Sequence, residues 1–407
     1  MTTPSFLDSI ASQLDWQREV YKDLHRNPEV SLDEHKTADR IAVELEGLGL
    51  EVTRISATGL VAVIDNGTGP TVLARADIDA LPVTEDTGLD FASEVDGVMH
   101  ACGHDMHAAA LLGAVRLLKE NQDAWSGTYI ALFQPAEENA AGAKAMIDDG
   151  LTDKVATPDV ALAQHVMPLP AGKIFTAAGP VMSAGDSVKI TVFGRGAHGS
   201  MPHLSVDPVV LAASIVLRLQ TIVSRETEPG EFAVVTVGAS NAGSKSNIIP
   251  DRAELLLNVR TYDTAVRKRV IASIERIVRG ECEAAGTPKE PTFEYFDQFP
   301  LTDNSEAVND TITEALTEFF GTEAVLEATP ETASEDFSEL PKAFGIPYAY
   351  WFVGSFDAEK YRAAEEAGTV FTDVPANHSP FFAPELEPTL EIATKAQVVG
   401  ALAYLGG

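Results

Sequence analysis

Cysteine, histidine and carboxylate residues gather in one short stretch of this sequence. The chain has only nine histidines, and three of them lie within Met99–His107. In that stretch Cys102, His104 and Asp105 fall within four residues, between an expected loop and the start of an expected helix. Thiolate and imidazole groups are good ligands for Zn²⁺ and related divalent ions, so this spacing indicates a metal site. The alternative is a helix start capped by Asp105, with incidental histidines beside it.

Two adjacent carboxylates, Glu137 and Glu138, follow the apolar run 128–133. Open α/β sheets bind ligands at the carboxyl ends of their strands, which is where this pair would lie. Adjacent side chains diverge, so one carboxylate can bind a metal while the other transfers protons. The alternative is an acidic pair that is favoured by the dipole of a helix beginning there.

Two further histidines lie in positions suited to a ligand. His165 directly follows the apolar run 160–164, and His378 lies in the turn-rich segment Val374–Pro380. A single histidine after a strand is more often structural. However, four separate segments offer ligand-type residues at expected loop positions, and this agreement favours a common site.

Asp77 and Asp79 belong to the same group, because they end the apolar run 72–76. The two-residue period of a strand places both carboxylates on one side. There they can orient a ligand histidine from behind. The alternative is that they form the turn before Pro82.

Secondary structure elements of an α/β protein must position these residues. Strands and helices alternate before residue 170, with helices expected at 34–48, 107–119 and 141–149 and strands at 60–64, 72–76, 128–133 and 160–164. This alternation predicts a helix-covered β-sheet. The pattern resumes later, with a helix at 306–319, a strand at 347–353 and a closing helical stretch at 385–405.

The middle of the chain has a different pattern. Its expected elements follow the order β-α-β-β-α-β, at 187–193, 207–218, 232–239, 252–262, 265–283 and 292–296. This order is typical of a ferredoxin-like α+β module. We therefore predict a two-domain α/β protein: a catalytic domain from residues 1–185 and 299–407, and an inserted domain at 186–298.

Composition excludes several functional classes. Lys and Arg number 29 and Asp and Glu 61, which gives a net charge of −32, and 45% of the residues are hydrophobic. The apolar content supports a sizeable core, and the acidic excess argues against nucleic-acid or anionic-membrane partners. We find no run of 18 apolar residues and no secretory signal at the start, so we expect no membrane span. Only Cys102 and Cys282 are present, which favours a reducing cytoplasm.

Taken together, the chain resembles the M20 family of metallo-amidohydrolases. Within that family it is most similar to the branch of hippurate hydrolases, N-acyl-amino-acid amidohydrolases and plant auxin-conjugate hydrolases. The matching segments run nearly end to end: His25–Glu29, Arg75–Pro82, His100–His107, Gln134–Glu138, Gly194–His198, Asn247–Pro250, Ser334–Phe337 and Asn377–Pro380.

The resemblance implies two divalent metal ions per chain, of Zn²⁺, Mn²⁺ or Co²⁺. The implied ligands are Cys102, His104, Glu138, His165 and His378. Cys102 would bridge the ions; Glu138 and His378 would complete one site, and His104 and His165 the other. Asp77 is not assigned as a ligand, and Asp79 would support a ligand histidine.

The resemblance also implies the catalytic roles. Glu137 would be the general base, and the inserted domain would be a lid and dimerisation domain. His198 would stabilise the oxyanion from the partner subunit of a homodimer. Asn247 and Arg260 would contact the substrate, because the planar fork of an arginine suits a carboxylate. A surface salt bridge is the alternative for Arg260.

The sequence therefore predicts a cytoplasmic, metal-dependent enzyme that hydrolyses N-acyl amino acids. Three alternatives stay open. One is a dipeptidase or aminopeptidase of the same fold. Another is a hydrolase with Cys102 as nucleophile, for which the sequence offers no obvious base partner. The third is a non-catalytic binding protein, against which the full ligand set beside Glu137 argues.

Overall fold

The computed structural model describes residues 5–406, which form two compact units. Unit 1 comprises the chain up to Val181, Asp303–Thr329 and the chain from Asp336 onward. Unit 2 comprises Met182–Thr302 together with the short segment Pro330–Glu335, which the sequence had not separated from its surroundings. The mixed α/β architecture expected from the sequence is confirmed.

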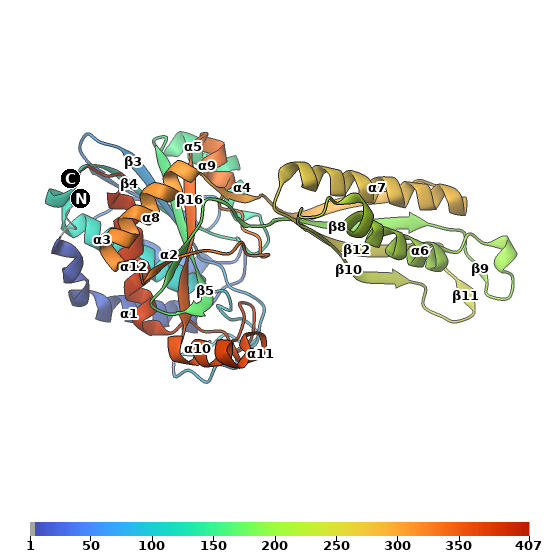
Figure 1. Cartoon of the computed structure of the whole chain (residues 1–407), viewed down its shortest axis with the longest axis horizontal. Helices are drawn as coiled ribbons and strands as arrows, with labels where there is room; N and C mark the ends of the chain where they lie inside the picture. The colour runs from blue at the N-terminus through green and yellow to red at the C-terminus, as the bar shows by residue number, and fades with distance from the viewer. Residues whose placement is uncertain (1–4, 407) are drawn as a thin grey trace. The chain divides into compact units, whose positions relative to one another are not determined.

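Unit 1 is built on an eight-stranded mixed sheet with the order β1-β2-β4-β3-β5-β16-β6-β15. Figure 1 labels β3, β4, β5 and β16 of this sheet. Its strands are β1 Val52–Ile55, β2 Gly59–Asn66, β3 Thr71–Asp77, β4 Gly127–Gln134, β5 Val160–Pro170, β6 Ile174–Thr176, β15 Val325–Glu327 and β16 Tyr348–Phe356. The central strands β4, β3, β5 and β16 are parallel to their neighbours in this group. Nearly every residue of these strands is buried, so both faces of the sheet are covered.

The helices of unit 1 surround this sheet. They include α1 Leu14–Arg26, α2 His35–Gly47, α3 His104–Glu120, α4 Gly142–Asp148, α8 Glu306–Phe320, α9 Glu339–Phe344, α10 Ala358–Ala367, α11 Val370–Asp373 and α12 Leu386–Leu402. Helix α3 packs against β3, β5, α1, α2 and α12. Most of its side chains are buried, because it lies between the sheet and other helices.

The register of the parallel strands brings the chemically interesting residues to one level. Asp77 at the end of β3 pairs with Gln134 at the end of β4. Arg75 pairs with Ala163 of β5, so His165, two residues further along, lies at the level of Asp77. The carboxyl ends of β3 and β4 therefore meet at the level of His165 in β5.

Two details of the predicted elements are wrong. Strand β5 continues to Pro170, so His165 lies within the strand and does not follow it. Helix α3 begins at His104 and not at residue 107, which places His104 in the first helical turn. The short strands β1, β6 and β15 were also not expected, because three or four residues carry too little periodicity to be recognised.

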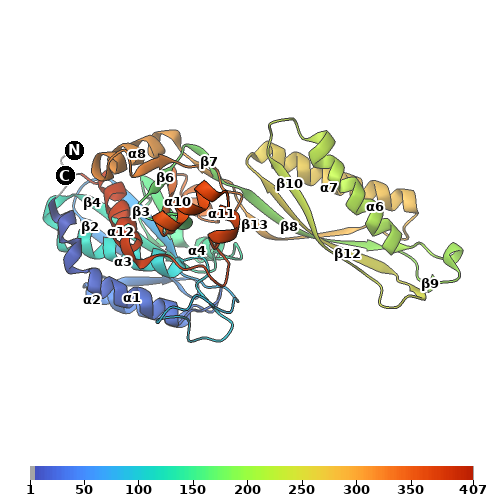
Figure 2. The ribbon, with the colours of Figure 1, turned by 60° about the horizontal axis from the view of Figure 1, so that its bottom comes forward.

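Unit 2 has the expected ferredoxin-like order β-α-β-β-α-β (Figure 2). Its elements are β8 Ala184–Phe193, α6 Pro208–Thr221, β10 Ala233–Ala242, β12 Arg252–Thr261, α7 Thr264–Ala285 and β13 Thr292–Phe299. The four strands form an antiparallel sheet with the order β10-β12-β8-β13, and α6 and α7 pack against it. A small pair, β9 Ala197–His198 and β11 Ile248–Ile249, lies outside this sheet.

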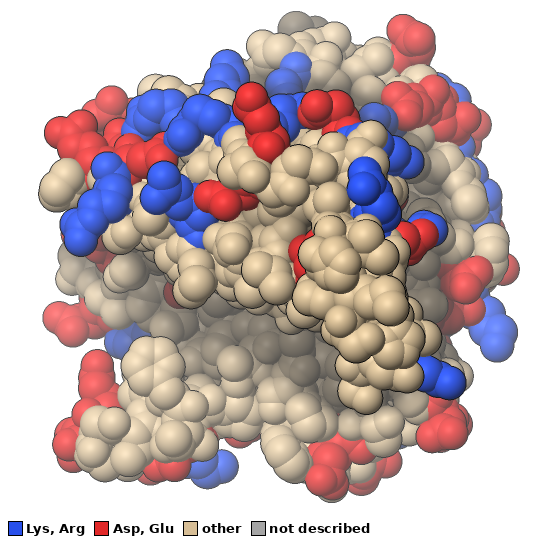
Figure 3. All heavy atoms as spheres, turned by 90° about the vertical axis from the view of Figure 1, so that its right-hand side faces the viewer, with Lys and Arg blue, Asp and Glu red and all other residues tan. Residues whose placement is uncertain are grey.

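Helix α6 has an apolar surface that its own unit leaves uncovered. Leu211, Ile215 and Leu219 are buried in the core of unit 2, whereas Val210 and Leu217 are 63% and 74% exposed. The stretch Pro208–Glu226 is long and apolar enough to cross a membrane by length and composition alone, with a mean hydropathy of 1.4. Figure 3 looks onto the end of unit 2 and shows broad areas without charged side chains.

Candidate metal and catalytic site

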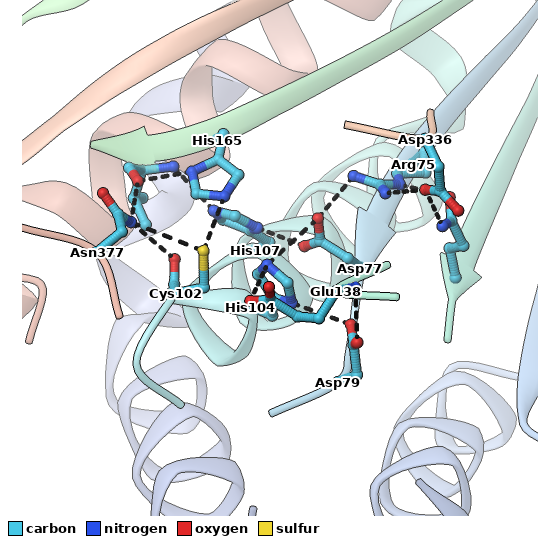
Figure 4. Close-up of polar contacts among 12 residues, drawn as sticks. Arg75, Asp77, Asp79, Cys102, His104, His107, Glu138, His165, Asp336 and Asn377 are labelled. Carbon is cyan, nitrogen blue, oxygen red and sulfur yellow. Dashed lines mark hydrogen bonds and ion pairs between the residues drawn. The ribbon is translucent and has the colours of Figure 1, made fainter. Parts of the chain in front are cut away.

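The ligands predicted from the sequence converge in unit 1. Figure 4 shows Cys102, His104, Glu138 and His165 among them. Ligand atoms of Cys102, His104 and His165 all lie within 4.8 Å of one another. The same holds for Cys102, Glu138 and His378. The two groups therefore share Cys102, and together they contain every residue that the sequence predicted as a ligand.

Individual distances define the centre of the site. The Sγ atom of Cys102 lies 3.4 Å from Nε2 of His165. The Oε1 atom of Glu138 lies 3.3 Å from Nε2 of His378 and 3.9 Å from Nε2 of His104. Glu137 is buried beside this group, within 4.8 Å of His104 and Glu138.

The backbone around Cys102 explains how a loop and a helix deliver adjacent ligands. Gly103 precedes α3 with φ +85°, a conformation that residues with a side chain rarely adopt. A Cβ atom at this position would also lie 2.4 Å from a methyl group of Val166. The turn connects to the C-terminal loop, because the N–H of His378 donates to the carbonyl of Ala101 at 2.8 Å.

The polar atoms at the centre fit a divalent cation. His104 Nε2 is buried and has no hydrogen-bond partner within residues 5–406. Glu138 Oε1 is also buried, and its 3.3 Å contact with His378 Nε2 does not form a hydrogen bond. Such atoms are costly in a protein interior unless a ligand or ion satisfies them. Thiolate, imidazole and carboxylate donors suit Zn²⁺ and related ions.

Burial sets the protonation of two of these residues. It raises the pKa of the Cys102 thiol, and the charge of Glu138 raises it further. Burial also lowers the pKa of His165 well below its usual range, which keeps the ring neutral. A metal ligand needs a neutral imidazole, and binding of an ion to Cys102 would release its proton.

Asp79 lies behind His104, as expected from the sequence. Its Oδ1 atom is 3.1 Å from His104 Nδ1, and its Oδ2 atom accepts from Ser31 Oγ at 2.7 Å and from the Glu138 N–H at 3.0 Å. This contact orients the ring so that Nε2 faces the site. Asp79 therefore connects one predicted ligand to the backbone of another.

Several residues around the site escaped the sequence interpretation. Glu34, just before α2, is buried against the turn that carries Glu137 and Glu138. Its carboxylate accepts a hydrogen bond from the N–H of Ala136 at 2.8 Å. His25 lies between two carboxylates, with Nδ1 2.6 Å from Asp105 and Nε2 3.2 Å from Glu85. Only His25, within a matching segment, gave any signal in the sequence, and its carboxylate partners are far away along the chain.

The remaining predicted site residues lie in unit 2. His198 on β9 pairs with Ile248, the residue that follows Asn247. The N–H of Ser200 donates to His198 Nδ1 at 3.2 Å, which makes Nδ1 an acceptor and leaves the proton on Nε2. Arg260 on β12 donates through Nε to Asn258 at 2.8 Å and through Nη1 to Ser334.

Arg260 differs from most arginines in unit 2. Its guanidinium is partly buried and forms no ion pair with any residue in the range 5–406, in contrast to the surface salt bridge considered from the sequence. Burial lowers its pKa, although the charge of Asp186 opposes that shift. A guanidinium in this position can donate hydrogen bonds to the carboxylate of a bound molecule.

Comparisons with known proteins agree with this geometry. The sequence model of peptidase family M20/M25/M40 matches residues 73–367. The chain is 38% identical to thermostable carboxypeptidase 2 of Saccharolobus solfataricus, over 85% of this chain and 87% of that protein. It is 39% identical to the N-acetyl-L-cysteine deacetylase of Bacillus subtilis (83% and 79% covered) and 38% identical to the hippurate hydrolase of Campylobacter jejuni (84% and 90% covered).

Solved structures show the same similarity. An aminohydrolase from methicillin-resistant Staphylococcus aureus superposes with a TM-score of 0.86 at 33% identity and covers 98% of this chain and 99% of its own. A Bacillus subtilis protein described as a dinuclear metal-binding peptidase of the M20 family gives 0.77 at 29% identity, with 96% and 98% covered. The chain belongs to peptidase family M20/M25/M40, and within it to the amidohydrolases.

The buried contacts of His25 with Asp105 and Glu85 should contribute to stability in a pH-dependent way. Burial lowers the pKa of His25, but Asp105 and Glu85 outweigh this effect and raise it to about 9. The charged ring therefore stabilises the fold fully below pH 6.5, its unfolded pKa, and this contribution is lost as pH rises through 9. His25→Gln should reduce the free energy of unfolding by about 3 kcal/mol more at pH 6 than at pH 10. Denaturant unfolding of both proteins at the two pH values measures this; an equal loss at both would contradict a charged His25.

Proposed function

We propose that this amidohydrolase binds two divalent metal ions per chain and hydrolyses the amide bond of N-acyl amino acids. The products are a free amino acid and a carboxylic acid. The observation that carries the proposal is the pair of ligand groups sharing Cys102, with the carboxylate of Glu137 beside them. The similarity to a deacetylase and a hippurate hydrolase supports this substrate class.

The proposed ligands divide into two sets. Cys102, Glu138 and His378 would hold one ion, and Cys102, His104 and His165 the other. When bound, such ions polarise a carbonyl and acidify water. Zn²⁺, Mn²⁺ and Co²⁺ all suit these donors.

Glu137 is the proposed general base. It is buried, and it directly precedes the proposed ligand Glu138. Its carboxylate would accept the proton of the attacking water and pass it to the leaving amine. Asp79 supports this arrangement, because it accepts a hydrogen bond from the N–H of Glu138 and so fixes the turn that carries both glutamates.

Three residues of unit 2 have proposed roles toward the substrate. Arg260 would bind the carboxylate of the amino acid, since its guanidinium has no carboxylate partner of its own in the described chain. Asn247 would donate a hydrogen bond to the substrate. His198, exposed and with its proton on Nε2, would stabilise the oxyanion.

We also propose that unit 2 is a lid and forms a homodimer, in which His198 serves the site of the partner. Strand β10 is an edge of its sheet and leaves a ladder of backbone groups for another strand. Beside it, helix α6 exposes Val209, Val210 and Leu217. A second copy of the chain would cover this apolar surface, which accounts for it without a membrane. Two free cysteines support a cytoplasmic location.

A peptidase is the second candidate function, because the chain also resembles a thermostable carboxypeptidase. A carboxypeptidase likewise cleaves the amide bond of an amino acid with a free carboxylate, so Arg260 fits both substrates. A dipeptidase or aminopeptidase would in addition need a group that recognises a free amine.

A cysteine nucleophile is less favoured by the site. His165 does lie 3.4 Å from Cys102 Sγ, although the sequence offered no base partner. However, burial and Glu138 raise the pKa of the thiol, which opposes a free thiolate.

The first prediction concerns substrate and metal. The purified protein should hydrolyse N-acetyl and N-benzoyl amino acids in preference to dipeptides with a free amino group. Elemental analysis should find up to two divalent ions per chain. Chelation should abolish turnover, and Zn²⁺, Mn²⁺ or Co²⁺ should restore it. Full activity of rigorously metal-free protein would contradict the two-metal proposal, and a preference for free dipeptides would favour the peptidase.

The second prediction separates the two glutamates. Glu137→Gln removes the proton acceptor but keeps the size of the side chain, so turnover should fall by about 10²–10⁴-fold with metal content unchanged. Glu138→Gln should weaken metal binding instead. Steady-state kinetics and elemental analysis of both variants measure this. The opposite pattern would reverse the assigned roles.

The third prediction tests the action of His198 across the dimer. His198→Ala should lower turnover by about 10²–10³-fold, the effect of losing one oxyanion donor, with metal binding intact. Mixing this variant with Glu137→Gln should restore activity, because one site of each heterodimer would hold both groups. Subunit exchange followed by assay measures the recovery. No recovery in demonstrated heterodimers would contradict action across subunits.

A further inference from the structure

His107 is a buried histidine of the Met99–His107 stretch for which the proposed mechanism has no use. Its Nδ1 lies 2.5 Å from Asp77 Oδ1, and its Nε2 accepts a hydrogen bond from the N–H of Val166 at 2.8 Å. A backbone N–H can only donate, so Nε2 carries no proton and Nδ1 donates to Asp77. The contacts thus define a neutral ring with a single tautomer.

This arrangement excludes His107 as a metal ligand. Asp77, His104 and His107 lie close enough to hold an ion, with ligand atoms within 4.8 Å of one another. However, both ring nitrogens of His107 are already hydrogen-bonded. Asp77 is also engaged, because its other oxygen accepts from Arg75 Nη1 at 2.7 Å.

Arg75 anchors the network at its far end. It is fully buried, contacts Asp336 at 3.4 Å and donates through Nε to Gln134 at 2.9 Å. Asp77 is fully buried as well, with one carboxylate oxygen on Arg75 and the other on His107. A buried carboxylate with these partners is a fixed acceptor for the His107 ring (Figure 4).

At its other end the network reaches a proposed ligand through Val166. The carbonyl of Val166 accepts from His165 Nδ1 at 2.7 Å and from Asn377 Nδ2 at 3.4 Å. The first contact places the proton of His165 on Nδ1, so its Nε2 lone pair faces Cys102. The orientation of His165 therefore depends on where the backbone of Val166 is held.

The sheet alone does not hold this part of β5 on both sides. The pairing of β5 with β3 ends at Ala163, three residues before Val166, while the pairing with β16 continues. The bond from Val166 N–H to His107 therefore takes the place of a ladder bond on the β3 side. It joins β5 to helix α3 beside His104.

We propose that His107 is a positioning residue that, held by Asp77 and Arg75, fixes the Val166 backbone and thereby the tautomer and direction of His165. The proposal rests on the proposed function for the role of His165 as a ligand. The geometric part, from Arg75 to the ring of His165, stands on the contacts of unit 1 alone.

Two amide variants test this role. His107→Gln keeps one donor and one acceptor at a reach similar to that of the ring, so it can span Asp77 and Val166. His107→Asn keeps the contact with Asp77 but is too short to reach the Val166 N–H. Asn66→Ala is the control: Asn66 donates to the carbonyls of Gln122 and Trp125 at 2.7 and 2.5 Å, at the opposite end of the sheet.

The first readout uses metal-free protein labelled with ¹⁵N-histidine. Long-range ¹H–¹⁵N correlation spectra report the tautomer of each ring. We expect His165 with its proton on Nδ1 in the unsubstituted protein, in His107→Gln and in Asn66→Ala. In His107→Asn this signal should shift and broaden. An unchanged His165 signal in His107→Asn, or its loss in His107→Gln, would overturn the proposal.

The second readout is equilibrium binding of Co²⁺, followed by visible absorption against a competing chelator. The ion held by Cys102, His104 and His165 should lose about 10–100-fold in affinity in His107→Asn, the usual effect of removing a group that supports a ligand. In His107→Gln and Asn66→Ala the affinity for Co²⁺ should differ from that of the unsubstituted protein by less than about threefold. An equal loss in Asn66→Ala would show general destabilisation and overturn the proposal. If the unsubstituted protein binds no Co²⁺, the proposed function fails, and the ring spectra still decide the role of His107.

Discussion

The structure depends on bringing ionisable side chains from distant segments into one buried place and keeping them aimed at its centre. Cys102, Glu138 and His378 approach within 4.8 Å of one another, although they come from a loop, a turn after β4 and the C-terminal loop. Without a cation this group leaves buried polar atoms unsatisfied. These side chains would be better solvated in water, so the surrounding chain must hold them in their buried positions.

The protein meets this demand by giving the supporting atoms fixed partners. Asp79 holds His104 and also the backbone of Glu138. The carbonyl of Val166 holds His165, and His107 holds Val166. Asp79 follows the end of β3, Val166 lies within β5, and His107 lies in the first turn of α3. The sheet register is thus the origin of the site geometry.

Unit 2 differs from unit 1, because several of its polar and apolar side chains are not satisfied by contacts within the unit. His198 is exposed, and the partly buried Arg260 has no carboxylate partner among residues 5–406. The uncovered apolar residues of α6 lie on the same unit. In the proposed function, a substrate would bind to Arg260 and a second chain would cover the apolar residues of α6.

The sequence by itself determined the architecture, and it pointed to residues that the structure brings together in unit 1. Alternating elements gave the sheet of unit 1, and the β-α-β-β-α-β order gave unit 2, because periodicity and turn residues are local signals. The clustering of scarce residue types identified Cys102 and His104. The ordered motifs of a known family supplied the assignments of Glu138 and His378.

Only the tertiary structure decided how the supports work. His107 was visible in its motif, but its partners Asp77 and Val166 lie on two strands whose register no local pattern encodes. The same applies to His25, whose raised pKa comes from Asp105 and Glu85. Hydrogen bonds and ion pairs depend on distances between remote segments, and packing fixes those distances, whereas periodicity records only which face of an element is buried.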